Sequence, residues 1–146
     1  MEKKLYILNG PNLNLLGTRE PKKYGTTIIK ELEVLCSNQC KKNILHLLFF
    51  QSNFEGDLIE KIHQARHDAC GIIINAGALT HTSIAILDAL TMFVGPKIEI
   101  HITNVYARES FRHKSYISPV STGIIAGLGI NSYLLAIDAI KKILDD

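Results

Sequence analysis

Five short apolar runs along the chain have the length and composition of buried strands. These runs lie at residues 5–8, 44–50, 71–74, 97–102 and 123–128. In the fourth run, isoleucines at every second position alternate with Glu99 and His101. Because successive side chains of a strand point to opposite faces, this strand is predicted to have one apolar face and one face that is not part of the core.

Helical patterns, in which apolar residues recur three and four positions apart, separate the five runs. Four helices are predicted: one that is capped by Thr26 or Thr27 and ends near Lys42, one with its apolar face at residues 58–65, one over residues 82–94 that is capped by Thr82 or Ser83, and one that begins at Asn131 or Ser132. Strands that alternate with helices form a parallel sheet covered on both faces, because each connection crosses over the sheet. The sequence therefore predicts a single α/β domain over residues 1–146, with a flavodoxin-like, doubly wound, five-stranded parallel sheet and helices on both faces.

The composition of the chain excludes several classes of protein. Its 146 residues and 47% hydrophobic content suffice for one core, and a net charge of +2 without runs of like charge gives no sign of binding to nucleic acid or to a membrane surface. The N-terminus lacks the pattern of a signal peptide, and no apolar run is long enough to span a membrane. Three cysteines do not suggest a disulfide framework, although Cys36 and Cys40 are predicted to share a helical face. We expect a cytoplasmic protein with reduced thiols.

Polar residues follow each of the first four predicted strands. They are Asn9, Asn12 and Asn14 after the first strand, Ser52 and Asn53 after the second, Asn75, Gly77 and His81 after the third, and His101, Thr103 and Asn104 at the end of the fourth. The C-terminal ends of parallel strands meet along one edge of the sheet, where open α/β sheets bind their ligands. We therefore expect the set to form one pocket, while Ser52, Asn53 and Asn104 taken singly are interpreted as helix caps or turn residues.

A long polar loop, TREPKKYG, follows the asparagine-rich segment LNGPNLNLLG and contains Arg19 and Tyr24. A phenol with its ordinary pKa of about 10 is a poor base at neutral pH. A neighbouring cation stabilises the phenolate, so Arg19 beside Tyr24 would make the tyrosine usable as a general base. The alternative is that both are ordinary residues of a surface loop.

Glu99 and His101 lie two positions apart on one strand, so their side chains point to the same side. A carboxylate in this position orients an imidazole and raises its pKa, which suits a general acid; a histidine satisfied within the core is the alternative. Binding of a metal ion by His81, Glu99, His101 and His113 is a further alternative. None of these residues has the compact spacing of known metal motifs, and no metal site is predicted.

Two further arginines, Arg108 and Arg112, stand four residues apart beyond the fourth strand. This spacing is typical of a solvated pair on a short helix. It also allows one of them to bind a hydroxyl or a carboxylate group.

Four blocks of the sequence resemble type II 3-dehydroquinate dehydratase: LNGPNLNLLGTREPKKYG, FFQSNFEGDLIEKIHQA, IIINAGALTHTSIAILDAL and IEIHITNVYARESFRHKSYISPVSTGIIAGLG. The likeness extends from residue 7 to about residue 138, and the fold of that family is also flavodoxin-like. The resemblance implies dehydration of 3-dehydroquinate to 3-dehydroshikimate through an enolate, without a metal ion, a nucleotide or a Schiff base. It further implies a homo-oligomer, a dodecamer of four trimers.

The resemblance also implies roles for eleven residues. Five match catalytic residues: Tyr24 as the general base, Arg19 beside it, Asn12 as the residue that holds a water against the enolate oxygen, His101 as the general acid, and Glu99 as its partner. Six match substrate-binding residues: Asn75 and the backbone around Ile102 and Thr103 for the carboxylate, His81 and Arg112 for the ring hydroxyls, and Asp88, which is contributed by a neighbouring subunit. The chain departs from the family pattern at Phe54, Leu79, Leu87 and Thr103; Thr103 keeps a hydroxyl in place of the usual serine, whereas Leu87 replaces a common arginine and is expected to weaken a subunit contact near Asp88.

Two other classes of function are compatible with a flavodoxin-like fold. One is a non-catalytic module that binds a flavin or receives a phosphoryl group, but a receiver needs acidic residues where this chain has Asn9, and the loop lacks a phosphate-binding signature. The other is an inactive homologue that serves as a scaffold, which the joint presence of the catalytic residues disfavours. Biosynthesis of aromatic compounds through the shikimate pathway and breakdown of quinate use the same reaction, and both pathways stay open.

Overall fold

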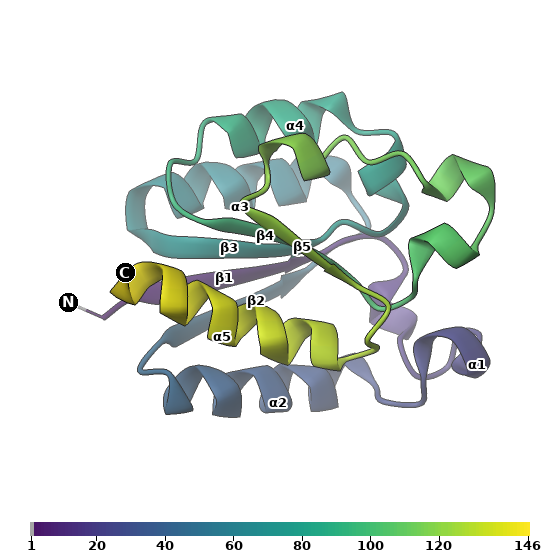
Figure 1. Cartoon of the computed structure of the whole chain (residues 1–146), viewed down its shortest axis with the longest axis horizontal. Coiled ribbons are helices and arrows are strands. Elements are labelled where there is room, and N and C mark those ends of the chain that lie inside the picture. The colour runs from purple at the N-terminus through teal and green to yellow at the C-terminus, as the bar shows by residue number, and fades with distance from the viewer. Residues whose placement is uncertain (1) are drawn as a thin grey trace.

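A five-stranded parallel sheet forms the centre of the computed structural model, which describes residues 2–146 (Figure 1). Its strands are β1 (Lys4–Asn9), β2 (His46–Gln51), β3 (Ala69–Asn75), β4 (Lys97–His101) and β5 (Gly123–Ala126), in the order β2-β1-β3-β4-β5. The chain passes from β1 to β2 on one side, then back across β1 to β3 and onward to β5. This reversal makes the sheet doubly wound and confirms the predicted flavodoxin-like architecture.

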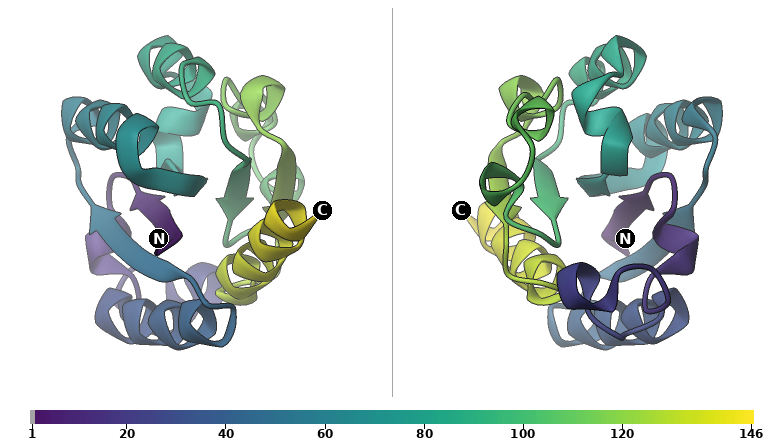
Figure 2. Two further views of the ribbon diagram at one scale, coloured as in Figure 1. Left: turned by 90° about the vertical axis from the view of Figure 1, so that its left-hand side faces the viewer. Right: turned by 90° about the vertical axis from the view of Figure 1, so that its right-hand side faces the viewer.

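Helices cover both faces of the sheet, as the end-on views of Figure 2 show. Helices α2 (Ile29–Lys42) and α5 (Asn131–Asp145) pack on one face, and α3 (Glu55–Asp68) and α4 (Ile84–Thr91) pack on the other. Alternate side chains of β1 belong to the two apolar cores: Leu5 and Ile7 contribute to the first, and Tyr6 and Leu8 to the second. Burial of the central strands β1 and β3 on both faces explains why they are nearly continuous apolar runs in the sequence.

Short helices fill the connections at the C-terminal edge of the sheet. They are α1 (Pro21–Tyr24) and five 3₁₀ turns at Leu13–Leu15, Gly77–His81, Val105–Ala107, Ser110–Arg112 and Ser118–Val120. Helix α1 was not predicted, and it begins with proline, whose fixed φ suits a first helical position. None of the helices within residues 2–146 is long and apolar enough to cross a membrane. Cys36, Cys40 and Cys70 are free thiols.

Several predicted boundaries were wrong by a few residues. Neither Thr26 nor Thr27 caps α2; the helix begins at Ile29, and its Glu31 carboxylate accepts a hydrogen bond from the backbone N–H of Ile28. Helix α4 has the predicted cap, Ser83, but ends at Thr91. Strand β5 ends at Ala126 because Gly127, at φ 88°, turns the chain away from the sheet.

Two loops approach each other closely where β1 and β3 end. A Cβ atom at Gly10 would lie 2.3 Å from the carbonyl oxygen of Ala76, so only glycine fits there. Gly77, at φ 60°, faces the carbonyl of Pro11 in the same contact. This close approach brings the segments that carry Asn12 and Asn75 to one place at the sheet edge.

Candidate active site

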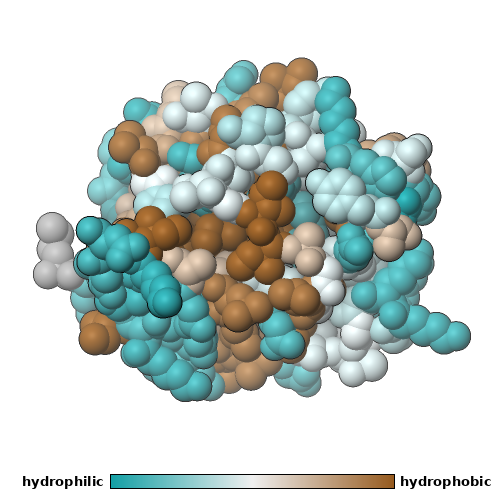
Figure 3. Space-filling model, in the orientation of Figure 1, coloured by the Kyte–Doolittle hydropathy of each residue, from teal (hydrophilic) through white to brown (hydrophobic). Residues whose placement is uncertain are grey.

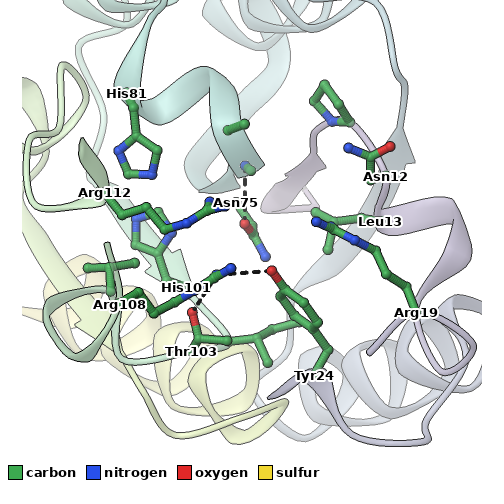
Figure 4. A pocket seen from close by; sticks show the side chains of 15 residues that line it. Asn12, Leu13, Arg19, Tyr24, Asn75, His81, His101, Thr103, Arg108 and Arg112 are labelled. Carbon is green, nitrogen blue, oxygen red and sulfur yellow. Dashed lines mark hydrogen bonds between the residues drawn. The ribbon is translucent and has the colours of Figure 1, made fainter. Parts of the chain in front are cut away.

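A cleft with about 580 Å³ of empty space opens at the C-terminal ends of β1, β3 and β4, where the sequence predicted a pocket (Figure 4). Nine of the eleven predicted site residues line it: Asn12, Arg19, Tyr24, Asn75, His81, His101, Ile102, Thr103 and Arg112. Glu99 is buried, contacts His101 and does not line the cleft itself. Asp88 is exposed on α4 and does not line the cleft within one chain.

Tyr24 is held by Arg108, an arginine that is not among the eleven predicted site residues. The Nη1 atom of Arg108 donates to the Tyr24 hydroxyl at 2.9 Å and to the Thr103 hydroxyl at 3.2 Å (Figure 4). The guanidinium of Arg19 lies over the Tyr24 ring, with its Cζ atom 5.0 Å from the ring centroid. Arg108 is therefore the direct partner of the tyrosine, and the interpretation of Arg108 as a solvated residue was wrong. Its spacing from Arg112 carried no signal that distinguished the two arginines.

Glu99 and His101 form a buried pair on β4. The Nε2 atom of His101 lies 3.3 Å from Glu99 Oε1, and the hydroxyls of Ser115 and Ser118 donate to the same carboxylate. Burial raises the pKa of Glu99, but the hydrogen bonds from His101 and the two serines outweigh burial and lower that pKa below its usual range. The pair lies outside both apolar cores, as predicted for this face of the strand, and the ionised carboxylate holds the imidazole in place.

The two serines that hold Glu99 were missed in the sequence. They belong to the irregular segment between β4 and β5, where neither periodicity nor a motif indicates which side chains turn toward the sheet. Their contacts depend on the path of that segment through space.

The other polar residues of the cleft are fixed by contacts with the backbone. The Oδ1 atom of Asn75 accepts from the backbone N–H of Gly77 at 3.3 Å, and Nδ1 of His81 lies 2.7 Å from the Lys114 carbonyl oxygen. The ring of His81 stacks on that of His101 with the centroids 6.5 Å apart. These side chains are therefore held in position before any ligand arrives.

Arg112 and Asn12 lie at opposite sides of the cleft mouth (Figure 4). The Nε atom of Arg112 donates to Glu109 Oε2 at 2.8 Å, which leaves its terminal nitrogens available. Asn12 adopts a left-handed backbone conformation with φ 71°, and its N–H donates to the Asn53 side chain at 2.9 Å.

Three polar residues after the strands have structural roles, as interpreted from the sequence. The Ser52 hydroxyl accepts from the backbone N–H of Phe54, and Asn53 holds the loop at Asn12. The Asn104 side chain accepts from the backbone N–H of Tyr106 and caps the next turn. Within residues 2–146, no group of three or more His, Cys, Asp and Glu side chains is arranged to hold a metal ion.

The fold and the cleft define a flavodoxin-like α/β protein whose site combines a tyrosine between two arginines with a buried Glu–His pair. Residues 3–141 match the family described as Dehydroquinase class II. The chain is 51% identical to the 3-dehydroquinate dehydratase of Dinoroseobacter shibae over 92% of this chain and 89% of the relative. It is 52% identical to the catabolic 3-dehydroquinase of Debaryomyces hansenii over 94% and 96%. The crystal structure of type II dehydroquinase from Propionibacterium acnes superimposes with a TM-score of 0.94 at 43% identity, covering 97% of this chain and 98% of that one. The chain belongs to the class II dehydroquinase family.

Proposed function

We propose that this chain is a 3-dehydroquinate dehydratase, a hydro-lyase that forms 3-dehydroshikimate and water through an enolate. The observation that carries the proposal is the joint presence, in one cleft, of a tyrosine paired with arginine and a histidine paired with a buried carboxylate. Elimination of water next to a ketone requires a base, stabilisation of the enolate and an acid for the leaving hydroxyl. The cleft supplies a candidate group for each of these requirements.

In this mechanism the Tyr24 phenolate removes the proton next to the ketone. The guanidinium of Arg108 donates to the oxygen of this base and that of Arg19 lies over its ring, and Asn12 holds a water against the enolate oxygen that forms. When the enolate collapses, the bond from carbon to the hydroxyl breaks and His101 donates a proton to the departing oxygen. The Glu99 carboxylate stabilises the imidazolium before this transfer. The products are the conjugated enone and one water molecule.

The remaining groups of the cleft suit a small anion that carries hydroxyls. We assign the substrate carboxylate to Asn75 and to the backbone of Ile102 and Thr103, which line the cleft. The Thr103 side chain is not included in this assignment, because its hydroxyl already accepts a hydrogen bond from Arg108. His81 and Arg112 are assigned to the ring hydroxyls. The relative named catabolic 3-dehydroquinase and the relative named 3-dehydroquinate dehydratase are about equally similar to this chain. The proposal therefore concerns the reaction and leaves both pathways open.

We also propose that the chain assembles with copies of itself into a dodecamer of four trimers. Exposed apolar side chains support self-association: the edge strand β5 and the adjoining part of the chain present Ile124, Leu128 and Leu135, each about half exposed. Figure 3 shows hydrophobic residues gathered at the centre of the face on which β5 and α5 lie. Asp88, exposed on α4, is then available to a neighbouring cleft. Native mass spectrometry tests the proposal, and we expect an assembly of twelve 16.2 kDa chains. A monomer that converts 3-dehydroquinate would contradict it.

The cytoplasmic location expected from the sequence stays a prediction.

The proposed activity is tested by adding the purified protein to 3-dehydroquinate in buffer that contains EDTA and following the ultraviolet absorbance of the conjugated enone. We expect a rise that also survives prior treatment of enzyme and substrate with borohydride, because no imine with a lysine forms. If folded protein gives no rise, the function is wrong and a non-catalytic binding module takes its place.

A further inference from the structure

We propose that Tyr133, a buried residue of α5 that does not line the cleft, is a positioning residue that sets which end of the Asn75 amide faces the substrate. The inference rests on the proposed function, in which Asn75 binds the substrate carboxylate. It begins with a chain of hydrogen bonds behind the cleft that joins β1, β3 and α5.

Three fully or almost fully buried side chains form this network. The Nδ2 atom of Asn75 donates to the Tyr133 hydroxyl at 2.8 Å, and this hydroxyl donates to Oδ1 of Asn9 at 2.6 Å. The Nδ2 atom of Asn9 donates in turn to the carbonyl oxygen of Phe50 at 3.2 Å. Buried polar groups that satisfy one another in this way specify a single arrangement, because any reversal leaves a donor or an acceptor without a partner.

The direction of the network is fixed at its far end. A backbone carbonyl only accepts hydrogen bonds, so Phe50 requires the nitrogen of Asn9 and leaves the Asn9 oxygen facing Tyr133. The tyrosine hydroxyl has a single proton, which it donates to that oxygen, and it therefore accepts from Asn75. At the near end, the backbone N–H of Gly77 donates to the Asn75 oxygen and supports the same orientation.

The consequence for the cleft is electrostatic. An amide nitrogen carries two N–H donors, and Asn75 uses one of them on Tyr133. The second N–H remains for a ligand in the cleft, where Figure 4 shows the amide near its centre. An N–H binds a carboxylate, whereas a flipped amide would present its carbonyl oxygen to the same anion and repel it.

The environment of α5 suits this role. Burial raises the pKa of the Tyr133 phenol far above its usual value, so the hydroxyl keeps the proton that defines the direction of the network. The preceding residue, Ser132, donates its hydroxyl to the backbone carbonyl of His101 at 3.1 Å. The first turn of α5 therefore contacts both Asn75, the proposed carboxylate-binding residue, and the backbone of His101, the proposed acid.

The test is the variant Tyr133→Phe, which removes only the hydroxyl, with Tyr6→Phe as its matched control. Tyr6 is also fully buried, and its hydroxyl donates to Asp68 at 2.6 Å at the opposite end of the sheet. Three quantities are measured for each: KM and kcat with 3-dehydroquinate, and the Kd of quinate, which has a hydroxyl in place of the ketone and cannot form the enolate.

We expect Tyr133→Phe to raise both KM and the Kd of quinate roughly tenfold or more. Without Tyr133 to orient the amide, the hydrogen bond from Asn75 to the charged carboxylate of the ligand is lost. Its kcat is expected to change much less, since the carboxylate is bound alike before and during the reaction. Tyr6→Phe should leave all three quantities near the wild-type values. Unchanged KM and Kd in Tyr133→Phe, or an equal rise in both variants, would overturn the proposal.

Failure of the proposed function is recognised separately, because wild-type protein would then not convert 3-dehydroquinate at all. In that case neutron diffraction from crystals exchanged into D₂O locates the deuterons of the Asn75 amide. Deuterons that face Tyr133 in the wild type and a reoriented amide in Tyr133→Phe support the positioning role. An amide with the same orientation in both proteins refutes it.

Discussion

Arg108 connects two parts of the cleft that are far apart in the sequence. Its guanidinium donates to Tyr24 in the first loop and to Thr103 after β4, and its side chain is almost buried. Arg19 contacts the face of the same tyrosine ring and is more exposed. Because a charge acts more strongly at close range and away from water, Arg108 is expected to have the greater influence on the base.

This difference predicts the outcome of two matched substitutions. Arg108→Lys keeps the charge but not the planar group that reaches both hydroxyls, so turnover of 3-dehydroquinate should fall roughly 10- to 100-fold. Arg19→Lys should lower turnover by a smaller factor. Steady-state kinetics on both variants checks the order, and an equal or larger loss in Arg19→Lys would contradict it.

Glu99 gives the folded protein a defined dependence on pH. Its pKa is lowered in the folded state, so its stabilising contribution is present above the unfolded-state pKa of about 4.3. That contribution is lost as the pH falls through the lower folded-state pKa. We expect the melting temperature of the wild type to drop more steeply below about pH 4.3 than that of Glu99→Gln. If the melting temperatures of the two proteins change in parallel between pH 3 and pH 7, Glu99 does not contribute in this way.

At the scale of elements, the C-terminus of α2 contains an unusual residue. The N–H groups of Ile44 and Leu45 donate to the carbonyls of Lys41 and Cys40, which is the Schellman pattern of helix termination. Ile44 occupies the left-handed position of this motif with φ 57°, where glycine is common and a β-branched residue is strained. Its side chain is 84% exposed, so little burial compensates for the strain.

Ile44→Gly is therefore expected to stabilise the protein by about 1 kcal/mol, because glycine has no Cβ atom to clash in the left-handed region. Thermal unfolding should show a rise in Tm of about 3 °C. Ile44→Ala is the control, since it removes most of the exposed side chain and keeps the Cβ. A Tm that rises as much in Ile44→Ala as in Ile44→Gly would mean that strain at this position is not the cause.

The sequence predicted the elements more reliably than their ends. Apolar runs located β1, β2, β3 and β5, and the alternation of isoleucines with Glu99 and His101 located β4. Helix ends depend on single contacts, such as the hydrogen bond from the backbone N–H of Ile28 to the Glu31 carboxylate at the start of α2, where a threonine cap was predicted. The same holds for the cleft: residues at strand ends, such as Asn75 and His101, line it together, whereas Ser115 and Ser118 reach Glu99 only through the folding of an irregular segment.

At the scale of the whole molecule, the parallel sheet determines where the chemistry lies. All five parallel strands end at one edge, where the loop after β1 carries Tyr24, the proposed base, and where β3 and β4 end in Asn75 and His101, the proposed carboxylate-binding group and acid. Asp88 is the exception, because it lies exposed on α4 outside the cleft of its own chain. A role for Asp88 in catalysis therefore requires a second copy of the chain.

Mixed oligomers test this requirement. We expect Asp88→Ala and Tyr24→Phe proteins each to have low activity alone. When the two chains assemble together at equal amounts, roughly a quarter of the sites combine an intact Tyr24 with a neighbour's intact Asp88, and activity returns in proportion. Activity of the mixture that only equals the average of the two parents would rule out a shared site.

The central claim is that Tyr24 removes the proton from the substrate, and the turnover of Tyr24→Phe tests it most directly. The substitution removes the only ionisable atom of the proposed base, and Tyr106→Phe, which changes an exposed tyrosine outside the cleft, is the control. We predict that turnover of 3-dehydroquinate falls at least ~100-fold in Tyr24→Phe while quinate still binds, and that Tyr106→Phe resembles the wild type. Turnover of Tyr24→Phe within a few-fold of the wild type would contradict the account, because another group would then have to act as the base.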